Sequence, residues 1–82
     1  MKTGKVQAGM ITDPVVAAKV NDVMVGIAGQ LDESVAFVMK RSSQEEFSRY
    51  RKAVGNVMGE LLLEILNPLY KQHPGLKPPQ LD

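Results

Sequence analysis

The chain has 82 residues, of which 44% are hydrophobic and 23% are charged, and its formal net charge is +1. This length allows one domain, and the composition excludes a disordered chain and argues against a generally basic nucleic-acid-binding surface. The absence of cysteine excludes a disulfide framework, cysteine-ligated zinc, iron–sulfur clusters and thiol catalysis.

The first twelve residues have no helical periodicity and contain two glycines, so we expect a flexible N-terminal arm over residues 1–12. The positive start of the chain is not followed by the apolar segment of a signal peptide. The longest uninterrupted apolar run, residues 35–39, has five residues, whereas a membrane-spanning helix needs about 20. We therefore expect a cytoplasmic protein with no membrane partner.

A long first helix is predicted over residues 14–40. Thr12 or Asp13 supplies an N-cap oxygen directly before Pro14, and proline suits the first helical position. Apolar residues then recur at steps of three and four, which is the period of a helix and not of a strand. These residues are Val16, Val20, Val23, Met24, Ile27, Leu31 and Val38.

Three residues weaken this helix in its middle. Gly26 and Gly29 each cost about 1 kcal/mol relative to alanine inside a helix. Asp32 can also cap a new helix. A break near residues 29–32, which gives a three-helix fold, is therefore the alternative to one continuous helix.

Residues 40–43 are predicted to form the turn into a second helix over residues 44–66. Ser43 with Glu46, or Ser42 with Glu45, has the spacing of a capping box. So short a connection makes the two helices antiparallel neighbours.

Pro68 is expected to interrupt the second helix, because proline has no N–H to donate and clashes with the carbonyl of Glu64. A short C-terminal turn over residues 68–72 follows. Residues 74–82 contain three prolines and are expected to form an extended tail. Residues 13–73 are then a single helical domain.

Two helices in one hairpin cannot enclose a core, because each leaves half of its apolar surface in water. Pairing two hairpins into a four-helix bundle buries these surfaces, and two-fold dimers are the commonest closed assembly. Gly55 and Gly59, four residues apart, allow the close approach of another helix. We therefore predict an all-α fold, an antiparallel helical hairpin that dimerises into a four-helix bundle. The core and dimer interface are expected to contain Val16, Val20, Val23, Ile27, Leu31, Val38, Phe47, Val54, Met58, Leu61, Leu62, Ile65 and Leu66.

No residue pattern in the chain supports catalysis or metal binding. The carboxylates of Glu60 and Glu64 lack the Glu-x-x-His pairs of di-metal bundles, and the single histidine, His73, lies beyond Pro68. His73 has no neighbouring nucleophile or orienting acid in the sequence, and no serine lies in a nucleophile elbow. We expect a protein that is not an enzyme and has no cofactor, metal or small-molecule ligand.

A basic patch at the turn supports an alternative function, in nucleic-acid binding. The cations of this patch lie within thirteen residues and could contact phosphates. They are Lys40, Arg41, Arg49 and Lys52. The sequence has no helix-turn-helix trio and no aromatic residues interleaved for base stacking, so nucleic acid is the less favoured partner.

The main prediction is a small non-enzymatic interaction or assembly module that acts as a homodimer, with another protein as a second kind of partner. The alternative is a nucleic-acid-associated regulator that uses the basic patch around residues 40–52.

Overall fold

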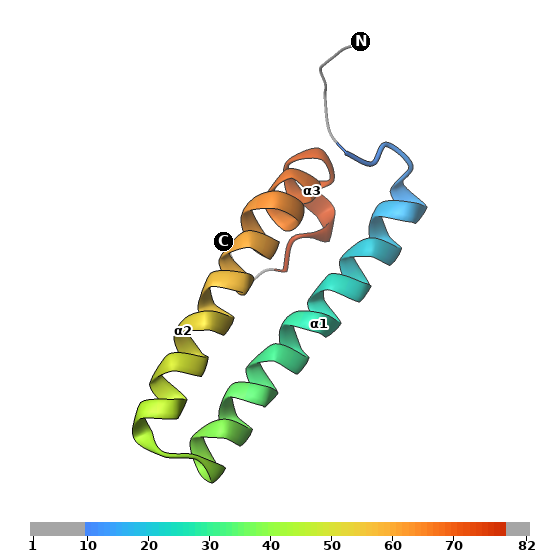
Figure 1. Ribbon diagram of the computed structural model, residues 1–82. Helices are drawn as coiled ribbons and strands as arrows, with labels where there is room; N and C mark the ends of the chain where they lie inside the picture. The colour runs from blue at the N-terminus through green and yellow to red at the C-terminus, as the bar shows by residue number, and fades with distance from the viewer. Residues whose placement is uncertain (1–9, 79–82) are drawn as a thin grey trace.

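The computed structural model describes residues 10–78 and contains two long helices packed antiparallel, α1 (Pro14–Arg41) and α2 (Gln44–Leu61) (Figure 1). The second helix continues through a π-helical turn, η2 (Leu62–Leu66), into the short helix α3 (Asn67–Gln72). One turn of 3-10 helix, η3 (Pro74–Leu76), follows. Residues 10–78 contain no strand. The predicted all-α class and the antiparallel hairpin are confirmed.

Helix α1 is continuous over 28 residues, and the alternative fold with a break near residues 29–32 is not adopted. Asp13, and not Thr12, caps it: the Asp13 carboxylate accepts hydrogen bonds from the N–H of Val15 at 2.8 Å and of Val16 at 3.5 Å. The glycines do not break the helix, because the apolar stripe keeps the same phase on both sides of them. An unbroken helix therefore keeps both halves of the stripe against α2.

The turn between α1 and α2 confirms the capping box at Ser43. The Ser43 hydroxyl accepts from the N–H of Glu46 at 3.1 Å, and the Glu46 carboxylate accepts from the N–H of Ser43 at 3.4 Å. Ser42 instead ends α1, with its N–H donating to the carbonyl of Val38 at 2.9 Å. The two serines therefore have separate roles in one tight turn.

Pro68 does not end the helical path, which differs from the predicted interruption. The turn before it is widened, so that the N–H of Asn67 donates to the carbonyl of Leu62, five residues earlier. A π-type turn of this kind absorbs one extra residue inside a helix. The chain therefore accommodates proline by a local change of helical pitch, and the short predicted turn over 68–72 becomes α3.

The end of the described chain also differs from the expected extended tail. Pro74–Leu76 form a 3-10 turn, and the backbone of Lys77 directly after it is extended. Residues 1–9 and 79–82, which include most of the predicted arm and the end of the predicted tail, lie outside the described residues.

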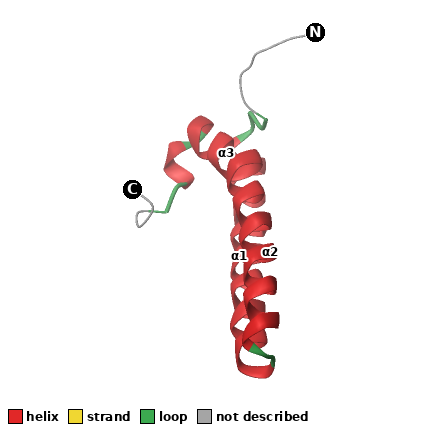
Figure 2. Cartoon of the chain, turned by 60° about the vertical axis from the view of Figure 1, so that its left-hand side comes forward, coloured by secondary structure: helices red, strands yellow, loops and turns green. Residues whose placement is uncertain are grey.

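The core lies at the open end of the hairpin, opposite the turn. Ala17 of α1 packs there with Leu66, Leu69 and Tyr70. Ile11, Val20, Met24, Leu61 and Leu76 pack around this cluster. In Figure 2, α3 and the segment after it lie to one side of the plane of the two long helices, so this end alone has a second layer.

Three polar contacts close the same end. The Tyr70 hydroxyl donates to the side-chain oxygen of Asn21 at 2.6 Å. The N–H of Ile11 donates to the side-chain oxygen of Gln72 at 3.3 Å, and the ring Nε2 of His73 donates to the carbonyl of Ile11 at 2.7 Å. Both backbone polar groups of Ile11 are thus satisfied by side chains at the end of α3, which ties residue 11 to α3.

The rest of the hairpin is a single layer. The molecule has principal extents of 49 × 26 × 21 Å and a radius of gyration of 15.8 Å, whereas a compact domain of this length has a radius of gyration of about 12 Å. Domains are usually built from two packed layers, because a helix buries one face and needs a neighbour to cover it. Along most of α1 and α2 that second layer is absent from the described chain, and two broad faces are left open.

We predict that Ser43→Ala destabilises the hairpin by about 1 kcal/mol, because it removes the capping oxygen of α2. The measurement is the urea midpoint by far-UV circular dichroism at one protein concentration. Ser42→Ala is the matched control, since Ser42 contributes its backbone N–H to the turn. Equal losses in the two variants would contradict the assigned role of Ser43.

Candidate functional site

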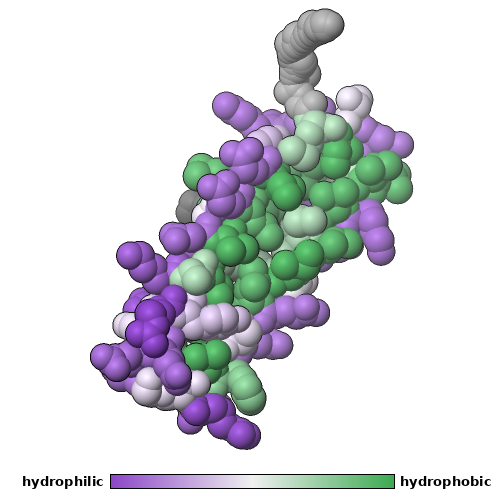
Figure 3. All heavy atoms as spheres, in the orientation of Figure 1, coloured by the Kyte–Doolittle hydropathy of each residue, from purple (hydrophilic) through white to green (hydrophobic). Residues whose placement is uncertain are grey.

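One side of the hairpin is an apolar face, which we call the front face. Residues spaced by seven and eleven lie on the same side of a helix, as do those spaced by four. In α1 the members are Val16, Val20, Val23, Ile27 and Val38, and in α2 they are Tyr50, Ala53 and Val57. Figure 3, drawn from this side, shows apolar residues in a band along the middle of the hairpin, with hydrophilic residues at its edges and around the turn.

Several large apolar side chains of the front face are exposed to solvent, whereas Val20, Val38 and Tyr50 are half-buried beside the seam. Val23 is 44% exposed, Ile27 39% and Val57 53%. An exposed apolar residue is ordinary when it stands alone, but a contiguous patch rimmed by polar residues is typical of an interaction surface.

A hydroxyl pair crosses the seam between the helices near the turn end of this face. The Ser34 hydroxyl donates to the carbonyl of Leu31 at 2.6 Å and lies 2.8 Å from the Tyr50 hydroxyl. The Tyr50 hydroxyl is therefore the donor to Ser34, since the serine proton is already used. This contact fixes the register of the two helices, with Ser34 level with Tyr50.

The opposite side of the hairpin, the back groove, holds an apolar cavity of about 540 Å³. Helix α1 contributes Val25, Ala28, Gly29 and Asp32 to its lining, and α2 contributes Met58, Gly59 and Leu61. The C-terminal part contributes Leu62, Leu66, Tyr70 and Pro78. A Cβ atom at Gly29 or Gly59 would meet nothing within 4 Å. Tyr70 and Pro78 of the C-terminal part line this cavity, and Figure 2 shows α3 and the segment after it on one side of the two long helices only.

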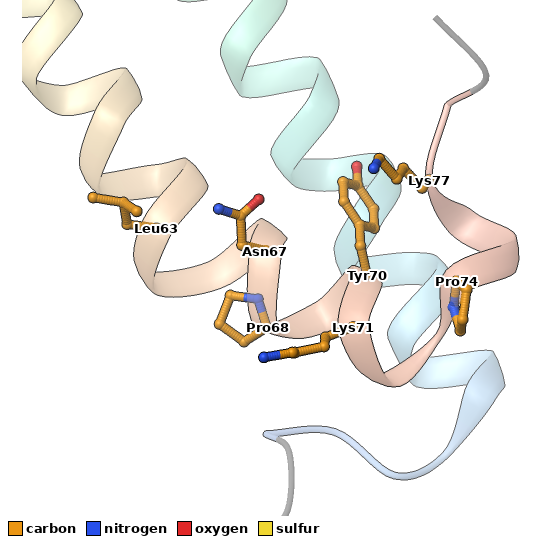
Figure 4. A pocket seen from close by; sticks show the side chains of 7 residues that line it. All are labelled: Leu63, Asn67, Pro68, Tyr70, Lys71, Pro74 and Lys77. Atoms are coloured by element: carbon orange, nitrogen blue, oxygen red, sulfur yellow. The ribbon is translucent and has the colours of Figure 1, made fainter. Parts of the chain in front are cut away.

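A wider hollow of about 1000 Å³ lies beside α3 (Figure 4). One side of the hollow is formed by Leu63, Asn67, Pro68 and Lys71, and the other side is formed by Pro74 and Lys77. The ring of Tyr70 lies between the two sides. Its two lysines are exposed and give it a positive rim that would attract anions. Its lining includes no carboxylate, histidine or hydroxyl pair that could move a proton, apart from the Tyr70 hydroxyl already bonded to Asn21.

The four cations of the predicted basic patch are all exposed, in the turn and in the adjoining ends of α1 and α2. Arg49 lines a shallow hollow of about 430 Å³ with Val38 and Tyr50 at the turn end of the front face. The Arg41 guanidinium lies 5.2 Å from the centre of the Phe37 ring. Lys40 and Lys52 occupy helix positions that point away from the seam, so they lie on opposite outer edges.

The residues predicted for the core and dimer interface divide into three groups. Val54 and Leu66 are buried within the chain. Val20, Leu31, Val38, Phe47, Met58, Leu61 and Ile65 are half-buried along the seam. Val16, Val23, Ile27 and Leu62 are exposed, the first three on the front face and Leu62 in the back groove.

Two exposed residues were missing from the predicted interface, Val57 on the front face and Val25 in the back groove. The spacing could have shown Val57, which is seven residues after Tyr50. Val25 lies outside the main apolar stripe of α1. The sequence alone does not show that it lines a groove, because that groove forms only where α2 packs beside α1.

The described residues contain no group of three or more His, Asp or Glu side chains that could hold a metal ion. None of the helices between residues 10 and 78 is long and apolar enough to cross a membrane. Comparison of the chain with known protein families, with curated proteins and with solved structures found no match.

Burial raises the pKa of the Tyr70 hydroxyl above its usual value of about 10. The unfolded chain therefore loses this proton at lower pH than the folded chain does. The stability contributed by the protonated hydroxyl is complete below pH 10 and is lost as the pH rises through the folded pKa.

We predict that Tyr70→Phe costs about 1 kcal/mol at neutral pH, because the side-chain oxygen of Asn21 loses its donor. We also expect the variant to lose less stability than the wild type between neutral pH and pH values above 10. Urea midpoints of both proteins across this range test the two effects. A constant difference between the two curves would contradict the coupling of Tyr70 ionisation to folding.

Proposed function

We propose that the protein is a helical assembly module that forms a homodimer through its front face, so that two hairpins make a four-helix bundle. The observation that carries the proposal is the contiguous apolar front face, in which Val16, Val23, Ile27 and Val57 are each between 39% and 53% exposed. A layer of two helices needs a second layer, and a second copy of the same hairpin supplies one of the right length and apolar pattern.

The size of the front face supports a stable dimer. Helix α1 has 28 residues, which gives a length of about 42 Å at 1.5 Å per residue, and two packed helices are about 20 Å wide. The face therefore covers about 800 Å², the area that each partner of a standard protein–protein interface buries.

The front face is favoured over the back groove because the C-terminal part leaves it unobstructed. Tyr70 and Pro78 line one end of the back groove, so a second hairpin laid flat on that side would meet α3 and the segment after it. The front face has no such projection along α1 and α2 (Figure 3). A flat apolar layer can pair with its own copy without rearrangement of the monomer.

The proposal is tested by the absolute mass in solution, measured by light scattering, for two matched variants. We expect Val23→Lys to convert the dimer to a monomer, because the two-fold axis would bury two ammonium groups without partners in an apolar interface. Val25→Lys is the control: Val25 is on the same helix and is exposed by 45%, against 44% for Val23, but it lies in the back groove. We expect Val25→Lys to remain a dimer.

Each other outcome overturns part of the proposal. A wild type that is monomeric and well folded at all concentrations would exclude the homodimer. Dissociation by Val25→Lys and not by Val23→Lys would place the interface in the back groove. Far-UV circular dichroism of both variants separates loss of pairing from loss of helix.

A further inference from the structure

Charge is unevenly distributed along the hairpin. Residues 36–52, around the turn, contain five lysines and arginines and two glutamates, a net charge of +3. Residues 13–35 and 53–66, which form the rest of the two-helix layer, contain six acidic residues and one lysine, a net charge of −5. Lys71 and Lys77 belong to α3 and the segment after it, which lie to one side of this layer. The turn end is therefore positive, and the remainder of the layer is negative.

The apolar residues of α1 have a symmetric arrangement about Ile27. Leu31 lies four residues after Ile27 and Val23 four before it, and Val38 lies eleven after and Val16 eleven before. The register set by Ser34 and Tyr50 places Ile27 level with Val57, because each lies seven residues farther from the turn along its helix. Ile27 is also at the midpoint of the 28-residue helix α1.

Two flat hairpins that pair by a two-fold axis in the interface have two aligned arrangements. In the parallel arrangement the two turns lie together, and α1 covers the α2 of the other copy. In the antiparallel arrangement the turns lie at opposite ends, and each long helix covers its own counterpart in the reverse direction. Like charges placed together oppose association, and complementary charges select orientation.

We propose that the two copies pair antiparallel, with the two-fold axis crossing the front face at the level of Ile27 and Val57. This inference rests on the proposed homodimer and specifies its geometry. The positive turn of each copy then lies over the negative open half of the other, whereas the parallel arrangement brings the two positive turns together. The symmetric spacing about Ile27 places Val23 opposite the partner's Leu31 and Val16 opposite the partner's Val38.

The same geometry pairs charged residues at the edge of the interface. Arg49 lies eight residues before Val57 and Glu64 seven after it, so Arg49 of one copy lies beside the partner's Glu64. Arg41 lies fourteen residues after Ile27 and Asp13 fourteen before it, so Arg41 lies beside the partner's Asp13. Exposed pairs of this kind add little affinity, and their effect is on orientation and salt dependence.

The distance between the two turns decides between the arrangements. The chain has no cysteine, so Ser42→Cys, at an exposed position of the turn, carries a single spin label. We expect about 40 Å between the two labels of a dimer, which is the length of α1. A distance under about 20 Å would show the parallel arrangement and overturn the inference.

Light scattering on the same labelled sample keeps the two proposals separable. A dimer with a short distance between labels contradicts the antiparallel pairing and leaves the homodimer intact. A monomer, which gives no dipolar signal between labels, contradicts both.

A charge exchange tests the predicted edge contact independently. We expect Arg49→Glu and Glu64→Arg to weaken the dimer roughly tenfold each, since each change acts twice across the two-fold axis, and the double variant to regain most of this loss. Arg51→Glu is the control, because Arg51 is exposed and lies seven residues before Met58, on the side of the back groove. Failure of the double variant to recover, with both single variants folded, would overturn the antiparallel register.

Discussion

A hairpin of two helices has a single line of contact, and this constraint shapes the molecule. Of the described residues only Ala17, Val54, Leu66, Leu69 and Tyr70 are buried, and four of the five lie where α3 folds over the end of the hairpin. Elsewhere a large apolar side chain can reach the seam with one side while its other side remains in water. The half-buried state of residues such as Leu31 and Met58 is therefore a consequence of having one neighbour, and not of poor packing between α1 and α2.

In a layer of two helices, apolar burial alone does not set how the helices are aligned, and a few hydrogen bonds do. Apolar contact is nearly insensitive to sliding of one helix along the other. The hydrogen bond from Tyr50 to Ser34 near the turn and the bond from Tyr70 to Asn21 near the open end lie on opposite sides of the middle of the seam. The first joins α1 to α2 and the second joins α1 to α3, so they hold α1 at both ends of the hairpin. The orientation of α1 against α2 determines which residues of α1 form the front face and which line the back groove.

The sequence predicted the elements whose cause is local. The N-cap before Pro14, the capping box at Ser43 and the three-and-four spacing of α1 each depend on residues within one or two turns, and each is found in the structure. The passage through Pro68 was not predicted, because proline marks an interruption but not the π-type turn at Leu62–Leu66 that carries the helical path past it. The candidate interface was predicted as one stripe, because a single helix shows which side is apolar but not how a neighbour divides that side. Placing α2 next to α1 separates Val23 from Val25, and it also sends Lys40 and Lys52 of the basic patch to opposite edges.

Affinity and orientation come from different residues in a surface of this kind. The valines and isoleucine of the front face favour association with any apolar layer of similar width, because burial is non-directional. In the proposed dimer, the symmetric spacing about Ile27 favours antiparallel pairing, and the separation of +3 at the turn from −5 in the rest of the layer disfavours parallel pairing. The glycines also distinguish the two sides of the hairpin. Gly29 and Gly59 lie in the back groove, where a Cβ would meet nothing, so their cost to the helices is not explained by packing within the chain. The front face, by contrast, carries side chains at every position that a second layer would contact.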